Sequence, residues 1–203
     1  MTEPYAAFAA TGLALALIAA WAFAEAIVLP VVPDVGLGIL LLAAPQQLPV
    51  LTAAAIGGGV VGALVLWGLL RHRPALVQRL LTAQPGLGEP GLKEARERLM
   101  RRGPLWGFVQ LGPGLPLKAF TAALAEVAPR TGYAAVATYA LTNRVTRLLP
   151  PAILFALAAP LLTGIEQSPV VFGALYVAAW VAFYFGYWWL RDPSRRRATP
   201  DSQ

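Results

Sequence analysis

The chain of 203 residues contains no cysteine and a single histidine. Without cysteine there is no disulfide, no thiol nucleophile and no thiolate metal site. A metal or haem site with an imidazole ligand would depend on His72 alone, which stands between Arg71 and Arg73. No histidine lies within an apolar run, where it could support phosphoryl chemistry. We therefore expect no metal, no cofactor and no enzymatic activity.

Charged residues are also scarce. They make up 13% of the chain, whereas about 25% is usual for soluble domains. Hydrophobic residues make up 58%, and the mean hydropathy is +0.62. Several apolar runs reach the roughly 20 residues that a membrane-spanning helix needs. The composition predicts an all-α polytopic membrane protein that forms a single integral membrane domain over residues 1–203.

The formal charge of +6 comes mainly from two flanks of apolar segments, residues 71–102 and 191–203. This distribution suits cytoplasmic loops beside lipid headgroups and argues against nucleic acid as a partner. No basic residue precedes the first apolar run, unlike in a secretory signal, so we expect that run in the mature protein. The sequence thus predicts a multi-pass protein of a bacterial-type inner membrane with a cytoplasmic C-terminus. Homo-oligomerisation stays open.

The most informative stretch is residues 103–130, an apolar segment that is broken in its middle. Each of its two apolar arms is far shorter than the roughly 20 residues of a spanning helix. The break contains glycines together with Pro113 and Pro116, which interrupt a helix, and Lys118 follows it. Non-helical backbone at membrane depth persists only beside protein or a water-filled cavity. We therefore predict a re-entrant helical hairpin next to a polar cavity.

Residues 5–45 repeat this pattern with a long apolar arm, a proline-containing tip and a short arm. Glu25 lies near the end of the long arm, and Asp34 lies at the tip. We interpret this segment as a first re-entrant hairpin. The alternative is a full span over residues 5–29 followed by a loop, and length alone does not decide between them.

Three further stretches, residues 48–70, 132–162 and 170–190, predict full transmembrane helices. In the first, Ala54, Gly58 and Gly62 recur every four residues, a spacing that lets helices approach closely. Counted back from a cytoplasmic C-terminus, the two hairpins enter from opposite sides, tip toward tip. This is the pattern of inverted-repeat transporters, whose sites form where broken helices meet.

The polar segment at residues 71–102 predicts cytoplasmic helices. Its second half places Leu92, Ala95, Leu99 and Met100 on one face with charges opposite. We interpret it as an amphipathic helix that lies on the headgroups.

Ionisable side chains within apolar segments usually face a cavity or a partner. Arg144 and Arg147 lie three residues apart and share a helix face, and two guanidinium groups suit a phosphate. The predicted substrate-binding residues are Lys118, Arg144, Arg147, Pro113, Pro116 and Asn143. The alternative is structural pairing, of Lys118 with Glu25 or Asp34 and of the two arginines with Glu126, Glu25 or Asp34.

Glu25 and Asp34 are the only acids near the first tip. A buried carboxylate beside a cation can exchange a proton near neutral pH, so we predict both for proton coupling. Asp34 has a competing structural role as the cap of a short helix that begins at Val35.

The ordered motifs resemble those of the DedA family, also called the VTT or SNARE-associated Golgi protein group. Glu25, Pro30, Pro33 and Asp34 resemble its acidic first motif. Residues 112–120 are similar to the Pro-x-x-Pro-x-Lys-x-Phe tip of its YqaA-like branch, and residues 143–147 to the Gly-Arg-x-x-Arg element that follows. The arginine-rich second motif of the main branch is absent from residues 110–116.

This resemblance implies a flippase or scramblase that moves undecaprenyl phosphate or a phospholipid between leaflets. Membrane lipids with phosphate heads would be the partners, and transport would be coupled to protons. The alternative is a non-transporting scaffold or assembly protein. A transporter needs a water-lined cavity that reaches the charged tips, whereas a scaffold would bury them in closed pairs.

Overall fold

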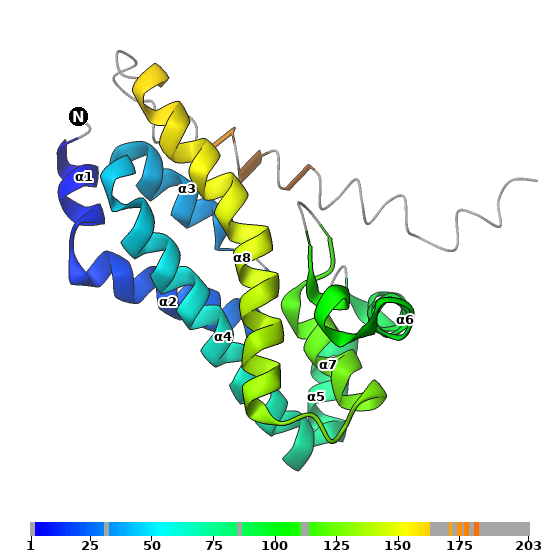
Figure 1. Ribbon diagram of the computed structural model, residues 1–203. Coiled ribbons are helices and arrows are strands. Elements are labelled where there is room, and N and C mark those ends of the chain that lie inside the picture. Colours follow the sequence, from blue (N-terminus) through cyan, green and yellow to red (C-terminus); the bar gives the residue numbers. More distant parts are fainter. Residues whose placement is uncertain are drawn as a thin grey trace, which may run out of the picture.

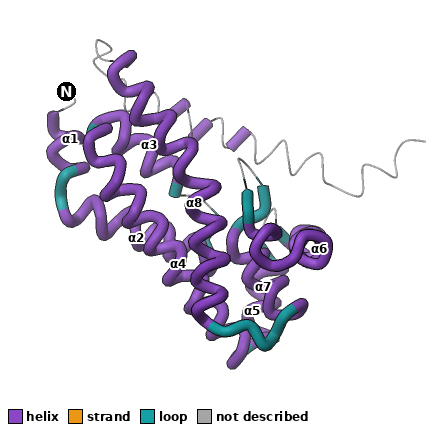
Figure 2. The backbone as a smooth tube through the Cα atoms, in the orientation of Figure 1, coloured by secondary structure: helices purple, strands orange, loops and turns teal. Residues whose placement is uncertain are grey.

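The computed structural model describes residues 3–30, 33–84, 87–110 and 114–162, together with scattered positions between 171 and 182. Within these ranges every regular element is a helix (Figures 1 and 2), which confirms the all-α prediction there. Pro113, most of the predicted span 170–190 and the predicted tail 191–203 lie outside the described residues. The elements in chain order are α1 (Glu3–Ala9), α2 (Gly12–Ile27), α3 (Asp34–Ala43), η1 (Pro45–Gln47), α4 (Leu48–His72), α5 (Pro74–Thr82), α6 (Gly88–Phe108), α7 (Leu117–Val127), α8 (Tyr133–Ala158) and η2 (Ala159–Leu162).

Among the described residues, two helical stretches are long and apolar enough to cross a membrane, Pro45–His72 and Tyr133–Leu161. They coincide with the predicted spans at residues 48–70 and 132–162. Pro150 and Pro151 lie inside α8 without ending it. The fold therefore supports the coarser prediction of a membrane-associated helical protein.

The long first arm of residues 5–29 is divided into two helices. Thr11 accepts a hydrogen bond from the backbone N–H of Ala14 at 3.2 Å and caps α2, and an N-cap threonine is a common helix start. Because of this break α2 has only 16 residues. That is short of the roughly 20 needed for a full span.

Helices α2 and α4 approach each other through glycines. A side chain at Gly58 would collide with the backbone carbonyl of Ala19, and a side chain at Gly62 would come within 2.5 Å of the carbonyl oxygen of Phe23. The close approach predicted from the small-residue spacing is thus confirmed.

Helix α6 contains a sharp turn at Gly103, where φ is 74° and ψ is 165°. This conformation is open to glycine and strained for other residues. The segment after the turn comes back against the segment before it, since a side chain at Gly107 would lie 3.2 Å from the Cα of Leu99. The predicted amphipathic face is right for Leu92, Ala95 and Leu99, which are buried.

Met100 was placed on that buried face wrongly. Its side chain is 60% exposed. Each residue of an α-helix is turned by about 100° from the one before it, so Met100 points away from the face that holds its neighbour Leu99.

Among the residues that the structure describes, two apolar cores lie toward opposite ends of α4 and α8. These two helices run side by side (Figure 1). One core joins α5, α6 and α7 to the end of α2 at Ala26 and to the adjacent ends of α4 and α8. The other joins α2 and α3 to their opposite ends. Between the cores, each of α2, α4 and α8 has a stretch that belongs to neither, and the charged residues lie there.

Candidate functional site

The candidate site is a layer of buried polar residues between the two cores, which we call the polar layer. It brings together residues from both predicted hairpins and from α8. Its members are Glu25, Asp34, Lys118, Asn143, Arg144 and Arg147, and each is at most 5% exposed. Charged side chains are rarely buried to this degree unless they are paired.

Arg144 of α8 forms an ion pair with Glu25 of α2 through its Nη2 and the Glu25 Oε2. Both side chains are inaccessible to solvent. Arg144 lies against Gly59 of α4, where any side chain would collide with the guanidinium group. Structural pairing was one of the two roles expected for Arg144, and Glu25 is its partner.

Lys118 links the two predicted tips by a hydrogen bond. Its Nζ donates a 2.7 Å hydrogen bond to the backbone carbonyl of Leu29, which follows the last turn of α2. Carbonyls at a helix C-terminus lack helical partners and carry partial negative charge. The expected alternative for Lys118 was a carboxylate partner, whereas its hydrogen bond goes to a backbone oxygen. Glu25 is nonetheless close enough to attract it electrostatically.

Asp34 and Arg147 occupy the side of the layer next to α3. Each is 5% exposed, and they attract one another electrostatically. Asp34 is the first residue of α3, and its side chain does not cap that helix. Neither Asp34 Oδ1 nor Arg147 Nη1 has a hydrogen-bond partner among the residues that the structure describes. The capping role considered for Asp34 is therefore absent.

The layer carries more positive than negative charge. Its three cations, Lys118, Arg144 and Arg147, face two carboxylates, Glu25 and Asp34. One positive charge is left over when all five are ionised. The Nε and Nη1 of Arg144 also lack hydrogen-bond partners among the described residues. Buried donors without partners are costly, and an anion would both balance the charge and accept these hydrogen bonds.

Asn143 and Pro116 have structural positions at this site. Asn143 is fully buried and donates from Nδ2 to the backbone carbonyl of Phe108 at 2.8 Å. Pro116 is the half-buried N-cap residue that directly precedes α7. Both were predicted to bind substrate, and both lie in or beside the polar layer.

Sequence reasoning missed Arg98 and Thr146, which also bind the backbone near the second tip. Arg98 donates to the carbonyl of Val109, and Thr146 accepts from the N–H of Gln110 at 3.2 Å. Their partners are main-chain groups, which leave no mark in the sequence. The Gly103-Pro104 dipeptide was the available signal, since Gly-Pro marks a turn that could bring Arg98 back toward the hairpin.

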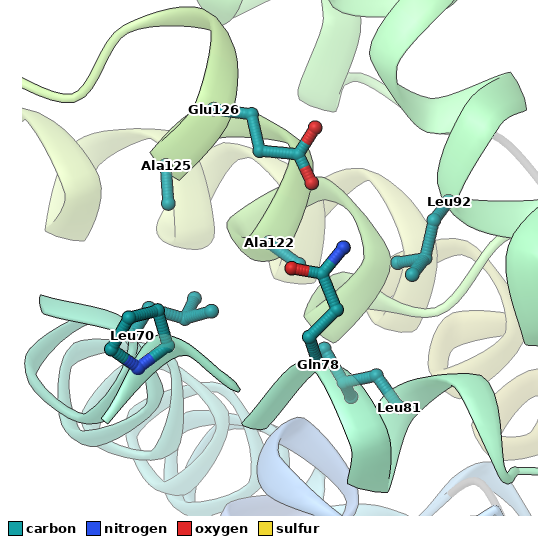
Figure 3. A pocket seen from close by; sticks show the side chains of 8 residues that line it. Leu70, Gln78, Leu81, Leu92, Ala122, Ala125 and Glu126 are labelled. Atoms are coloured by element: carbon teal, nitrogen blue, oxygen red, sulfur yellow. The ribbon is translucent and has the colours of Figure 1, made fainter. Parts of the chain in front are cut away.

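A separate pocket of about 120 Å³ lies among α4, α5, α6 and α7. Figure 3 shows the Glu126 carboxylate and the Gln78 amide among apolar walls. Glu126 forms an ion pair with Arg96, and both side chains are more than one-third exposed, Glu126 at 35% and Arg96 at 39%. Glu126 is therefore not the partner of the buried arginines. The pocket is lined by Leu70, Pro74, Gln78, Leu81, Leu92, Ala122, Ala125 and Glu126.

No protein-family model matches this chain, and neither a curated protein nor a solved structure matches it.

Proposed function

We propose that this protein is a DedA/VTT-like membrane transporter that moves a phosphate-headed lipid between leaflets. The observation that carries the proposal is the excess of buried positive charge in the polar layer, where guanidinium donors of Arg144 and Arg147 lack partners in the described part of the chain. Phosphate oxygens accept such charge-assisted hydrogen bonds, which are roughly twice as strong as neutral ones.

The proposed architecture has two opposed re-entrant hairpins. The contact between Lys118 and the Leu29 carbonyl supports it, because it joins the two tips across 89 residues of sequence. The 16 residues of α2 and 11 residues of α7 suit arms that turn back within a bilayer rather than cross it. The spans α4 and α8 would hold the hairpins between them, with the C-terminus in the cytoplasm.

In the proposed cycle this arrangement is the closed state. For a lipid headgroup to enter, the tips separate and Lys118 leaves the Leu29 carbonyl. The phosphate then takes hydrogen bonds from Lys118, Arg144 and Arg147 while the apolar tail stays in the bilayer. Glu25 and Asp34 neutralise the cations when the headgroup leaves, either as ion pairs or through the uptake and release of a proton.

A non-transporting scaffold is the second candidate, and one observation favours it. The Arg144–Glu25 pair is closed to solvent, which is how charges that only lock two hairpins would look. A scaffold has no need for the surplus cation, however. Removing that surplus should leave a scaffold folded, whereas it should impair a transporter.

The test is translocation of a fluorescent phosphate-headed lipid in proteoliposomes. We expect Lys118→Ala, Arg144→Ala and Arg147→Ala each to slow translocation by about tenfold or more, since a hydrogen bond to a charged group contributes roughly 1.5–3 kcal/mol. The exposed Arg130 provides the control variant Arg130→Ala, which should retain the parent rate. If all three variants move the lipid at the parent rate, the scaffold hypothesis is favoured. The same holds if the parent protein moves no lipid.

A further inference from the structure

Three consecutive residues at the end of α6 have main-chain groups that are held by side chains from elsewhere in the fold. The carbonyl of Phe108 accepts from Asn143 Nδ2 at 2.8 Å, and the carbonyl of Val109 accepts from Arg98. The N–H of Gln110 donates to the hydroxyl of Thr146 at 3.2 Å. Val109 is already extended, with φ −62° and ψ 122°. Backbone groups that have left a helix need such partners when they are buried.

Two of these three side chains alternate along α8 with the buried cations. Asn143 and Thr146 are three residues apart and share one helix face. Arg144 and Arg147 follow each of them by one position and present the next face. One stretch of α8 therefore binds the backbone of residues 108–110 and also supplies both arginines of the polar layer. If the backbone of residues 108–110 moved along α8, its distance from Arg144 and Arg147 would therefore change.

Arg98 connects the same backbone to the other arm of the second hairpin. Its guanidinium group lies 5.4 Å from the ring centroid of Phe120, a distance typical of a cation–π contact. Phe120 comes two residues after Lys118 in α7, and its ring lies 5.5 Å from that of Phe108. Arg98 thus contacts both arms of the hairpin while belonging to the part of α6 that precedes the Gly103 turn.

We propose that Arg98, Asn143 and Thr146 form a tip clamp that positions the second hairpin, and with it Lys118, against the cations of α8. Through Arg98 the clamp also links the amphipathic part of α6 to the polar layer. These are positioning residues, since none of them needs to touch the headgroup. The consequence for transport rests on the function proposed above, whereas the mechanical role of the clamp does not.

The absence of cysteine allows a direct test of the mechanical role. Leu115, next to the tip and 3% exposed, is replaced by cysteine as a reporter. Its rate of modification by a membrane-permeant maleimide is measured in proteoliposomes. We expect Thr146→Val and Arg98→Met to raise this rate by about tenfold, because the loss of a hydrogen bond worth roughly 1–1.5 kcal/mol shifts an opening equilibrium by that factor. Thr146→Ser keeps the hydroxyl and should keep the reporter protected.

Matched controls lie on the same helices. Thr138 is exposed, and its hydroxyl donates to the Ala134 carbonyl of its own helix, so Thr138→Val should leave the reporter protected. Arg101 is exposed on α6, and Arg101→Met should do the same. If reporter modification in Thr146→Val and Arg98→Met matches these controls, the clamp does not exist. If Arg98→Met does not yield a folded protein, the comparison of valine with serine at position 146 decides.

Translocation by the same variants, without the reporter, tests the consequence for transport. We expect Thr146→Val to lower the maximal rate about tenfold, in proportion to the lost hydrogen bond, with the half-saturating lipid concentration unchanged. Thr146→Ser should restore the rate. If the reporter is deprotected while the parent protein moves no lipid, the clamp stands and the proposed function fails. If transport is normal in a deprotected variant, the clamp does not position the site.

Discussion

At the residue scale, the decisive fact is that the buried charges are incompletely matched. The Glu25–Arg144 pair is closed to solvent, and removing one partner of such a pair typically costs about 3–5 kcal/mol because the other is left buried. Asp34, Lys118 and Arg147 do not form ion pairs of this kind among the described residues. A substitution at Glu25 therefore tests the buried ion pair, whereas a substitution at Arg147 tests a buried cation that has no such pair among the described residues.

Glu25→Gln should abolish lipid translocation while the protein stays folded in the membrane. The amide keeps an acceptor for Arg144 but removes the negative charge, so the excess positive charge of the layer grows from one to two. Translocation and the yield of monodisperse protein are measured together. Loss of folded protein would make the charge purely structural, and full activity across pH would exclude proton coupling through Glu25.

Arg147→Lys should restore only part of the translocation lost in Arg147→Ala. Lysine keeps the positive charge but cannot present two parallel N–H donors to a phosphate. The measurement compares initial rates of the two variants with the parent at equal amounts of reconstituted protein. Equal rates for the lysine variant and the parent would mean that only charge matters at this position.

The site was only partly predictable from sequence. Lys118, Arg144 and Arg147 stood out because ionisable residues in apolar segments are rare, and the structure brings them together. The sequence could not decide that Arg144 pairs with Glu25 and not with Glu126, because this depends on how α2 and α8 are placed relative to each other. Arg98 was read as part of a solvated face, although the Gly103 turn brings it back to the hairpin.

At the element scale, glycine positions on α4 control how closely α2 can pack. Helix spans were recognisable from apolar length, and the spacing of Gly58 and Gly62 correctly indicated a close contact. The break at Thr11 was missed because a cap inside a continuous apolar run has no hydrophobic signature. The predicted boundary between the polar segment and the hairpin, at residues 102 and 103, coincides with the Gly103 turn. The return of the following segment against Leu99 was missed because it depends on packing within α6.

Gly58→Ala should reduce the amount of folded protein, whereas Gly57→Ala should not. A methyl group at position 58 would collide with the Ala19 carbonyl, whereas a methyl group at position 57 would meet no atom within 4 Å from the described residues outside its own helix. The neighbouring glycine is therefore a matched control for helix propensity, which differs by roughly 0.5–1 kcal/mol between glycine and alanine. Detergent-solubilised yield and thermal stability are the measurements. Equal stability of the two variants would contradict the close α2–α4 contact.

At the scale of the whole molecule, the fold is two apolar cores separated by the polar layer. The prediction that the two hairpins enter from opposite sides, tip toward tip, came from counting the topology back from a cytoplasmic C-terminus, and it stays a prediction. The sequence did not reveal that α4 and α8 pass through both cores. That feature depends on long-range packing of residues such as Leu51 and Leu148, which are unremarkable in sequence.

Cysteines introduced at Glu89 and Ser194 should react only from the cytoplasmic side. Both positions adjoin the most basic segments, and basic loops stay in the cytoplasm. Intact cells are treated with a membrane-impermeant thiol reagent, and permeabilised cells provide the positive control. Labelling of either cysteine in intact cells would overturn the predicted topology, and with it the opposed entry of the hairpins.

The two prolines inside α8 also affect the mechanics of the helix. Proline has no N–H to donate, so Pro150 and Pro151 deprive the carbonyls of Thr146 and Arg147 of their usual partners four residues on. The backbone ladder is thus interrupted directly beside the polar layer. Before this interruption α8 is anchored in one core by Val136 and Ala140. Leu148, within the interrupted stretch, and Ala152, just beyond it, belong to the other core. Because α8 has fewer backbone hydrogen bonds beside the polar layer, it should bend most easily there. Bending at this point would rotate one apolar core relative to the other.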